Sequence, residues 1–130
     1  MKPKTQKVLL YIFLVVVSIM IGFGAGFQKL IYTDQLARNM AAIHFGEMAT
    51  RLIGLAEVLA VVGMWFFRFR TAAILALYPI LFGAIAAHLG AGQPLQEVIL
   101  SIVCIVLITI LLFLHNWNGV IYLLTQKDKL

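Results

Sequence analysis

One apolar run with a carboxylate near its middle, residues 51–67, constrains the fold of this chain most strongly. The run is long enough to cross a bilayer, and Glu57 lies near its centre. Insertion scales put the cost of an Asp, Lys or Arg at that depth at about 2.5–3.5 kcal/mol. Gly54 and Ala60 fall on the same helix face, and small residues let another helix approach closely. We therefore expect Glu57 to face other helices, a partner or a water-filled cavity rather than lipid.

The composition predicts the class of protein. Hydrophobic residues make up 63% of the 130 residues and charged residues only 12%, and the mean hydropathy is +1.03. A soluble domain of this length could not cover so much apolar surface with so few charges. The net charge of +5 lies in the termini and loops, where basic residues set the orientation of a membrane protein. We therefore expect the lipid bilayer, and not a nucleic acid, as the chain's partner.

Four apolar segments predict four transmembrane helices, at residues 8–27, 48–67, 71–90 and 95–114. The first segment is longer than the h-region of a signal peptide, which has about 7–15 residues. We interpret it as a retained span, although residues 24–26 are small enough to mimic a cleavage site. The polar connection at residues 31–46 is expected to lie on the outer membrane surface, with Asp34 capping a short helix.

Basic residues indicate the orientation of these spans. The N-terminal segment, the turn at residues 68–70 and the C-terminal tail fall on one side and carry most of them: Lys2, Lys4, Lys7, Arg68, Arg70, Lys127 and Lys129. The other side carries Lys29, Arg38 and Arg51. Because basic loops stay in the cytoplasm, we predict an all-α, antiparallel four-transmembrane-helix bundle with both termini cytoplasmic. It would form a single domain over residues 1–130, as a multi-pass protein of the bacterial cytoplasmic (inner) membrane.

Several residues are expected to shape the helices rather than to bind a ligand. Small residues recur every four positions in the first span, and Pro79 interrupts the third span, where it predicts a kink. A tight antiparallel turn at residues 68–70 joins the second and third spans. The structural candidates are Gly22, Gly26, Gly54, Pro79 and Arg70.

Polar residues in the outer half of the bundle form a candidate site: Gln28, Lys29, Glu57 and His88, with His44 as a further member. Helical rise alone places Glu57 about 15 Å, His88 about 25 Å and Lys29 about 30 Å above the cytoplasmic ends. Lys29 could lean inward, and His88 could reach Glu57 through water or Gln28. The alternatives stay open: Glu57 as a buried hydrogen-bonding group, Lys29 reaching to the interface, and His88 as a structural residue.

The histidines and the cysteine do not form a metal or redox motif. His44, His88 and His115 lack the spacing of metal ligands, and His115 falls on the opposite side of the membrane from the others. Cys104 is the one cysteine, which excludes an intramolecular disulfide and a Cys-x-x-Cys pair. We expect no metal site, and we expect Cys104 to pack as a small apolar group.

Short motifs distributed over all four spans resemble the DoxX-like membrane proteins. The matching stretches are Gly-Phe-Gln-Lys-Leu at 26–30, Gly-Leu-Ala-Glu at 54–57, Arg-Thr-Ala-Ala at 70–73, and His88 near the end of the third span. The chain departs from many bacterial members at residues 113–119, where they carry a glycine-rich, serine-containing pattern. Residues 88–95 are also similar to the animal DoxX-like chaperones of nicotinic receptors, so the branch stays open.

The resemblance implies a redox-linked subunit or an assembly factor, and transport stays open as a third function. The name-giving members are small membrane subunits of a thiosulfate:quinone oxidoreductase, which favours an accessory subunit of a redox complex, not an enzyme on its own. Its polar pocket would bind a quinone-like or other lipophilic ligand, with Glu57 accepting a proton or hydrogen bond and His88 exchanging with the outer side. The alternative is an assembly factor, in which Glu57 pairs with a client helix. Proton-coupled transport is the third, and four spans leave little room for it unless the chain forms a homodimer.

The predicted topology can be tested with reporter fusions. A reporter fused after Met40 and one fused after Gln93 should both report the outside, because both positions lie opposite the basic ends of the spans. A fusion after Phe69, in the basic turn, serves as the cytoplasmic control. A cytoplasmic signal from either outer position would overturn the topology.

Overall fold

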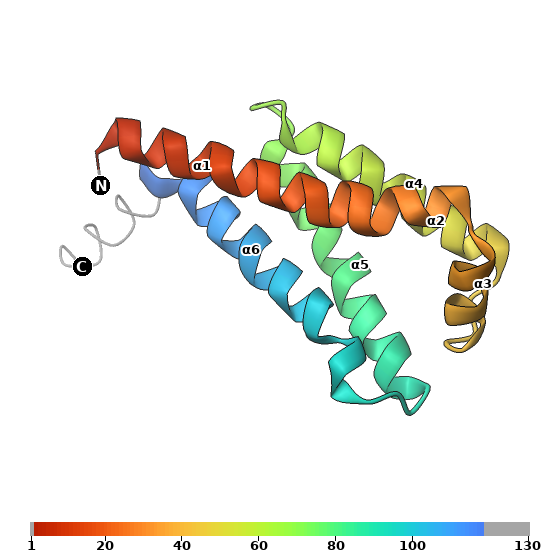
Figure 1. The fold of residues 1–130 in the computed structure, drawn as a ribbon. Helices are drawn as coiled ribbons and strands as arrows, with labels where there is room; N and C mark the ends of the chain where they lie inside the picture. The colour runs from red at the N-terminus through yellow and green to blue at the C-terminus, as the bar shows by residue number, and fades with distance from the viewer. Residues whose placement is uncertain (1, 119–130) are drawn as a thin grey trace.

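The computed structural model describes residues 2–118, which form helices joined by short turns (Figure 1). In chain order these are α1 (Pro3–Val17), η1 (Ser18–Phe27), α2 (Gln28–Ile31), α3 (Asp34–Ala41), α4 (Glu47–Met64), α5 (Arg70–Gly90), η2 (Leu95–Glu97) and α6 (Ile99–His115). The described part of the chain contains no strand, so the all-α prediction is confirmed there. The basic tail with Lys127 and Lys129, and the C-terminus itself, lie outside the described residues.

Two helices within residues 2–118 are long and apolar enough to cross a membrane. The first is the continuous helix Pro3–Ile31, formed by α1, η1 and α2, which contains an 18-residue stretch with a mean hydropathy of 2.7. The second is α5, which contains an 18-residue stretch with a mean hydropathy of 2.0. α6 is apolar but shorter, with 17 residues. α4 has 18 residues and carries Glu47, Arg51 and Glu57. The length and composition of the first helix and of α5 are therefore those of membrane spans.

The middle of the first helix, η1, is a π-helix. Its i→i+5 hydrogen bonds make a wider turn than those of an α-helix, and such turns are rare outside short insertions. Gly22, Gly24, Ala25 and Gly26 lie in this stretch, so few side chains oppose the change of winding. The sequence did not predict the π-helix. In a segment that is apolar on all sides, the spacing of apolar residues does not distinguish a π-helix from an α-helix.

Helix ends differ from the sequence-based prediction: the first helix runs over Pro3–Ile31 and α6 begins at Ile99. Thr33, not Asp34, is the N-cap of α3, since its Oγ1 accepts a hydrogen bond from the Leu36 amide at 3.3 Å. α4 ends at Met64 rather than at residue 67. Arg70 Nε donates to the Met64 carbonyl oxygen at 2.7 Å and so satisfies one of the acceptors that a helix C-terminus leaves without a partner.

The small-residue face of η1 packs antiparallel against α4. Trp65, just after α4, donates from Nε1 to Ser18 Oγ at 2.8 Å. One turn further along η1, Gly22 faces Val61, whose Cγ1 would lie 3.3 Å from an added Cβ. The end of α4 is therefore level with Ser18, in the middle of the long first helix.

The closest contact between the two backbones is made by Gly26 of η1 and Gly54 of α4. A Cβ added to Gly54 would lie 2.6 Å from Lys29 Cβ and 2.7 Å from the Gly26 carbonyl oxygen. A Cβ on Gly26 would lie 3.1 Å from the Gly54 carbonyl oxygen. Small residues at a helix interface permit this kind of approach, and here it sets how deeply Lys29 reaches toward α4.

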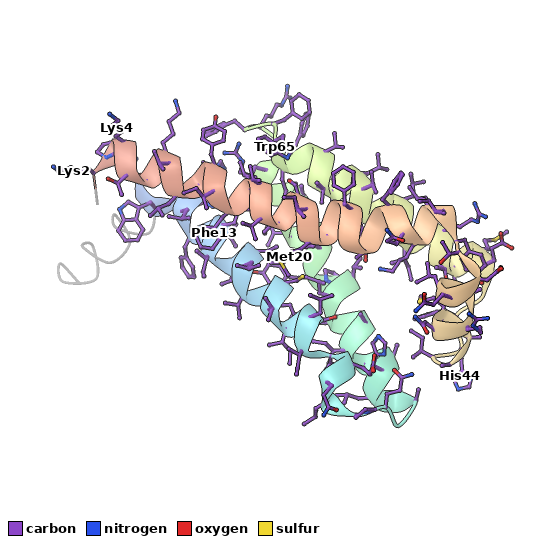
Figure 2. The ribbon with its side chains drawn as sticks, in the orientation of Figure 1. Lys2, Lys4, Phe13, Met20, His44 and Trp65 are labelled. Carbon is purple, nitrogen blue, oxygen red and sulfur yellow. The ribbon has the colours of Figure 1, made fainter. Side chains whose placement is uncertain are left out.

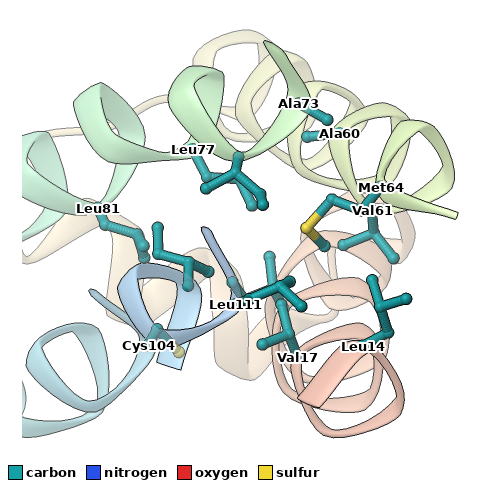
Figure 3. Close-up of a cluster of buried hydrophobic side chains, with 13 residues drawn as sticks. Leu14, Val17, Ala60, Val61, Met64, Ala73, Leu77, Leu81, Cys104 and Leu111 are labelled. Atoms are coloured by element: carbon teal, nitrogen blue, oxygen red, sulfur yellow. The ribbon is translucent and has the colours of Figure 1, made fainter. Parts of the chain in front are cut away.

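The buried core lies between α1, η1, α4, α5 and α6, and Figure 3 shows its side chains. Leu14, Met64, Leu77 and Leu111 are among its fully buried members. Cys104 belongs to the same cluster and packs there as a small apolar side chain. The core therefore joins α1 to α6 and α4 to α5 at the end of the molecule where α1 begins.

At the other end, α5 and α6 diverge from η1 and α2 as they approach the turn that connects them (Figure 1). The helix contacts there are chiefly those of α2 with α4 and of α5 with α6. Within the second pair, the hydroxyls of Tyr78 and Thr109 are hydrogen-bonded at 2.6 Å. The two pairs thus separate toward this end, which we call the diverging end.

The Gly26–Gly54 contact predicts a position-dependent cost of a single methyl group. Gly54→Ala should destabilise the protein by about 1–3 kcal/mol, the usual cost of overpacking, because the new Cβ meets backbone that cannot move away. Gly24→Ala is the matched control in η1, since its Cβ would meet only the Ile19 carbonyl oxygen at an ordinary 3.5 Å. Thermal unfolding in detergent should separate the two variants. Equal melting temperatures would contradict the close backbone contact.

Candidate functional site

A cavity of about 450 Å³ lies at the diverging end. Its walls come from every helix that meets there: Ala25, Lys29, Met40, Ile43, Phe45, Ile53, Glu57, Pro79, Ile80, Gly83, Ala84, His88, Glu97, Leu100 and Ser101. Most of these side chains are apolar, and a few polar groups converge among them, as in pockets that bind small molecules. Pockets that bind small molecules have volumes of about 300–1,000 Å³, and this cavity falls within that range. We call this cavity the outer pocket.

Glu57 and Lys29 form a buried ion pair on one wall of the outer pocket. Lys29 Nζ lies 2.7 Å from Glu57 Oε1, and the two side chains are 17% and 4% exposed. The glycine contact produces this pair, because it holds Lys29 Cβ against α4 three residues before Glu57. Lys29 therefore does not extend to a polar interface but points into the protein.

The second carboxylate oxygen of Glu57 is buried without a hydrogen-bond donor among the described residues. Leaving a buried polar atom without a partner costs about 1–3 kcal/mol, and more for a charged group. Native proteins keep such atoms rarely, and each one needs an explanation. Glu57 also lines the outer pocket, so the carboxylate that lacks this donor lies next to the cavity.

His88 and Gln28 have different positions relative to this pocket. His88 lies in the last turn of α5 and lines it, and its Nδ1 donates to Gln93 Oε1, which fixes the ring. That bond leaves Nε2 as the acceptor of the neutral ring. Gln28 is exposed and is not part of the wall. The structure thus brings Lys29, Glu57 and His88 to one cavity and leaves Gln28 outside it.

His44 lies away from the outer pocket. It follows α3, has a left-handed backbone with φ 64°, and is exposed. Figure 2 shows its side chain at the tip of the segment after α3, pointing away from the helices. Ile43, the preceding residue, is buried and lines the pocket in its place. α3 and this loop therefore contribute apolar cover rather than a histidine.

Two polar residues of the pocket wall were not among the sequence-based candidates. Glu97, in η2, and Ser101, in α6, line the cavity together with Glu57 and Lys29. Their spacing in the sequence could have indicated this. Glu97 and Ser101 are four residues apart, and residues four apart lie on one face of a helix. Their addition makes the pocket more acidic than the candidate set predicted.

The axial positions inferred from helical rise require a correction. They separated Lys29 from Glu57 by about 15 Å, whereas the two side chains are in contact. The estimate assumed that all spans start at one level. The end of α4 instead lies level with Ser18, well inside the first helix, which brings Glu57 up to the level of Lys29.

The remaining candidates lie outside the pocket or shape it. Pro79 is part of its wall. Arg70 and His115 lie together at the other end of the molecule, 3.3 Å apart between Nη1 and Nδ1. Glu47 and Arg51 form an exposed ion pair at 3.0 Å on the surface of α4. Among residues 2–118, no group of three His, Cys, Asp or Glu side chains could hold a metal ion.

Comparison with known families gives one match. Residues 12–111 match the model of a family described as the DoxX-like family. The matched range includes η1, α2, α4 and α5 in full and therefore Lys29, Glu57 and His88. Neither a curated protein nor a solved structure matches the chain.

A double-mutant cycle tests the buried ion pair. Lys29→Gln and Glu57→Gln each leave one charge buried without its partner, whereas the double variant removes both charges. We therefore expect a coupling free energy of about 0.5–3 kcal/mol from unfolding in detergent, with the double variant less destabilised than the sum of the single ones. The matched control is the exposed Glu47–Arg51 pair, whose coupling should stay below about 1 kcal/mol. Equal coupling in the two cycles would contradict a buried Lys29–Glu57 pair.

Proposed function

Because the chain belongs to the DoxX-like family of membrane proteins, we propose that it is an accessory membrane subunit of a redox complex whose outer pocket binds a quinone-like or other lipophilic ligand. One observation carries this proposal. Glu57 Oε2 is buried in the pocket wall and has no donor among the described residues. A ligand hydroxyl placed there would satisfy it.

The chemistry of the outer pocket fits a neutral ring with a carbonyl or hydroxyl at its edge. Lys29 Nζ carries three N–H donors, of which Glu57 Oε1 takes one. The others can donate to a ligand carbonyl, while Oε2 can accept from a ligand hydroxyl. Ile53, Ile80 and Leu100 offer apolar contact to the ring and its tail. When bound, a quinone would supply reversible transfer of electrons and protons, and the protein would hold and orient it.

Proton exchange with the outside would pass through the polar residues near the turn between α5 and α6. His88 lies in the last turn of α5, and Glu97 lies just after that turn. Both line the same pocket as Glu57. A neutral histidine oriented through Nδ1 presents Nε2 as an acceptor, which suits it to pass a proton between a ligand and the outside.

In the membrane, we propose that the long first helix, α4, α5 and α6 each cross the bilayer as an antiparallel four-helix bundle, with α3 on the outer surface. α4 and α6 span about 27 and 26 Å at the rise of an α-helix, close to the bilayer core of about 30 Å. Lys2, Lys4, Lys7, Arg68 and Arg70 gather at one end of this arrangement. We propose that this end faces the cytoplasm of a bacterial cell and that both termini are cytoplasmic, as the basic residues predict.

The size of the outer pocket favours a small molecule over a client helix. A single helical turn, a cylinder about 10 Å across and 5.4 Å tall, already occupies about 420 Å³. The pocket holds about 450 Å³, so a client helix would need the walls to separate over several turns. We therefore place the assembly factor second and treat it as an outcome of the experiment below.

Binding of a short-tailed benzoquinol, compared with its dimethyl ether, tests the role of Glu57. The ether has the same ring but cannot donate a hydrogen bond to Oε2. We expect the purified protein to bind the quinol about tenfold or more tightly than the ether, because a hydrogen bond to a charged group is worth about 1.5–3 kcal/mol. In Glu57→Gln this preference should fall toward one, since a neutral amide is a weaker acceptor.

The ratio of the two affinities is insensitive to a general loss of stability, which makes it the informative quantity. Glu47→Gln removes an exposed carboxylate outside the outer pocket and should keep the preference of the wild type. Equal affinity for quinol and ether in the wild type would overturn the proposed ligand chemistry. Glu57-dependent crosslinking to another membrane protein, without quinol binding, would overturn it in favour of the assembly factor.

A further inference from the structure

Arg70 is a buried cation at the end of the molecule opposite the outer pocket. Only 4% of the surface of Arg70 is exposed. The carboxylate side chains within residues 2–118 are Asp34, Glu47, Glu57 and Glu97, and neither described salt bridge involves Arg70. A buried charge without a counter-charge is expensive. Its guanidinium therefore calls for an anion that these residues do not provide.

The guanidinium is held in one orientation. Nε donates to the Met64 carbonyl oxygen at 2.7 Å, and Nη1 donates to His115 Nδ1 at 3.3 Å. The Phe67 ring lies 6.0 Å from the guanidinium carbon and packs edge-on against the His115 ring. These contacts use neutral acceptors and leave Nη2 without a hydrogen-bond acceptor among the described residues.

A cavity of about 530 Å³ adjoins this guanidinium, and we call it the Arg70 cavity. Its polar lining comes from Gln6, Lys7 and Tyr11 of α1, from Arg70, and from His115 and Asn118 at the end of the described chain. Because His115 accepts at Nδ1, its Nε2 carries the proton and is a donor. The lining thus presents two cations and several donors, and no carboxylate of the described residues is part of it.

A second, apolar groove shares the lining residue Trp65 with the Arg70 cavity. It holds about 470 Å³ and runs between η1 and α4, lined by Gly22, Phe23, Val58 and Val62 among others. An anion site and an apolar groove therefore meet at one tryptophan, and a molecule with a charged head and a hydrocarbon tail would fill both.

Interfacial residues surround the Arg70 cavity. Lys2 and Lys4 lie at the same end of α1 (Figure 2). Tyr11 and Trp65 have ring centroids 6.4 Å apart on its wall. Lysine and aromatic side chains of this kind mark the level of the lipid headgroups, and basic pockets between helices there bind anionic lipid headgroups.

We propose that the Arg70 cavity binds the phosphate-bearing headgroup of an anionic lipid, whose acyl chain lies in the groove between η1 and α4. Arg70 and Lys7 pair with the phosphate, and His115 Nε2 and Tyr11 donate to the headgroup. This lipid site is separate from the outer pocket. It does not depend on the ligand proposed for Glu57.

Fluorescence of Trp65 in the full-length protein tests this site. The chain has two tryptophans, so Trp117→Phe leaves Trp65 as the single fluorophore. Phosphatidylglycerol with brominated acyl chains, titrated into protein in neutral detergent, should quench Trp65 at lower concentration than phosphatidylcholine with the same chains. Bromine quenches at contact, so the measurement reports the chain in the groove as well as the headgroup preference.

Charge variants on α1 provide the matched comparison, because replacing Arg70 could unfold the protein. Lys7→Gln should weaken phosphatidylglycerol binding about fivefold, the effect of one basic residue near an anionic headgroup. Lys4→Gln makes the same charge change three residues away, on a side chain that does not line the cavity, and should leave binding nearly unchanged. Melting temperatures without lipid check that both variants fold.

Four results would overturn the proposal. Equal quenching by the two lipids would exclude headgroup recognition. Equal weakening by Lys4→Gln and Lys7→Gln would indicate diffuse surface charge. Competition by glycerol phosphate at the same concentration as the lipid would indicate a site for a free anion. A lipid preference that appears only in Asp128→Asn, a change outside the described residues, would mean that the tail carboxylate is the partner of Arg70.

Discussion

Gly26 of η1 and Gly54 of α4 bring two helix backbones into direct contact, and the arrangement of the polar groups depends on that contact. Lys29 follows Gly26 by three residues and Glu57 follows Gly54 by three, so the glycines determine the separation of the two charges. A methyl group on either residue would meet backbone atoms within 3.1 Å. The ion pair, 2.7 Å from Nζ to Oε1, therefore exists because two side chains are missing beside it.

The two ends of the molecule use buried charge in opposite ways. At the diverging end, α5 and α6 leave the first helix, and the resulting cavity is lined by Glu57, whose Oε2 is buried without a donor among the described residues. At the other end the helices are joined by the core, and a cation is fixed by neutral acceptors. The outer pocket suits a neutral molecule that can donate a hydrogen bond, and the Arg70 cavity suits an anion.

The sequence predicted correctly which helix faces are buried, but it did not predict the positions of the helices along one another. The membrane class, the small-residue face of the first helix and the shelter of Glu57 follow from composition and helical periodicity. The offset along the axis between the first helix and α4 does not follow from composition or periodicity. Two apolar helices can slide past each other without any change in the hydrophobic pattern of either sequence. That offset decides that Lys29 meets Glu57. Gln28 and His44 were grouped with the site because they are polar and fall in the outer half of the predicted bundle, but both are exposed and neither lines the pocket.

The unequal lengths of the helices have a consequence for the lipid around them. The first helix has 29 residues, whereas α4 has 18, about 27 Å at the rise of an α-helix. If both helices cross the bilayer as proposed, a bilayer core of about 30 Å matches α4, and the longer helix can match only by tilting or by projecting its basic first turns into water. In that arrangement a thicker membrane would reduce the mismatch for the first helix and increase it for α4. Because the two helices are in contact at Gly26 and Gly54, a change in membrane thickness would then act on the angle between them, and so on the walls of the outer pocket.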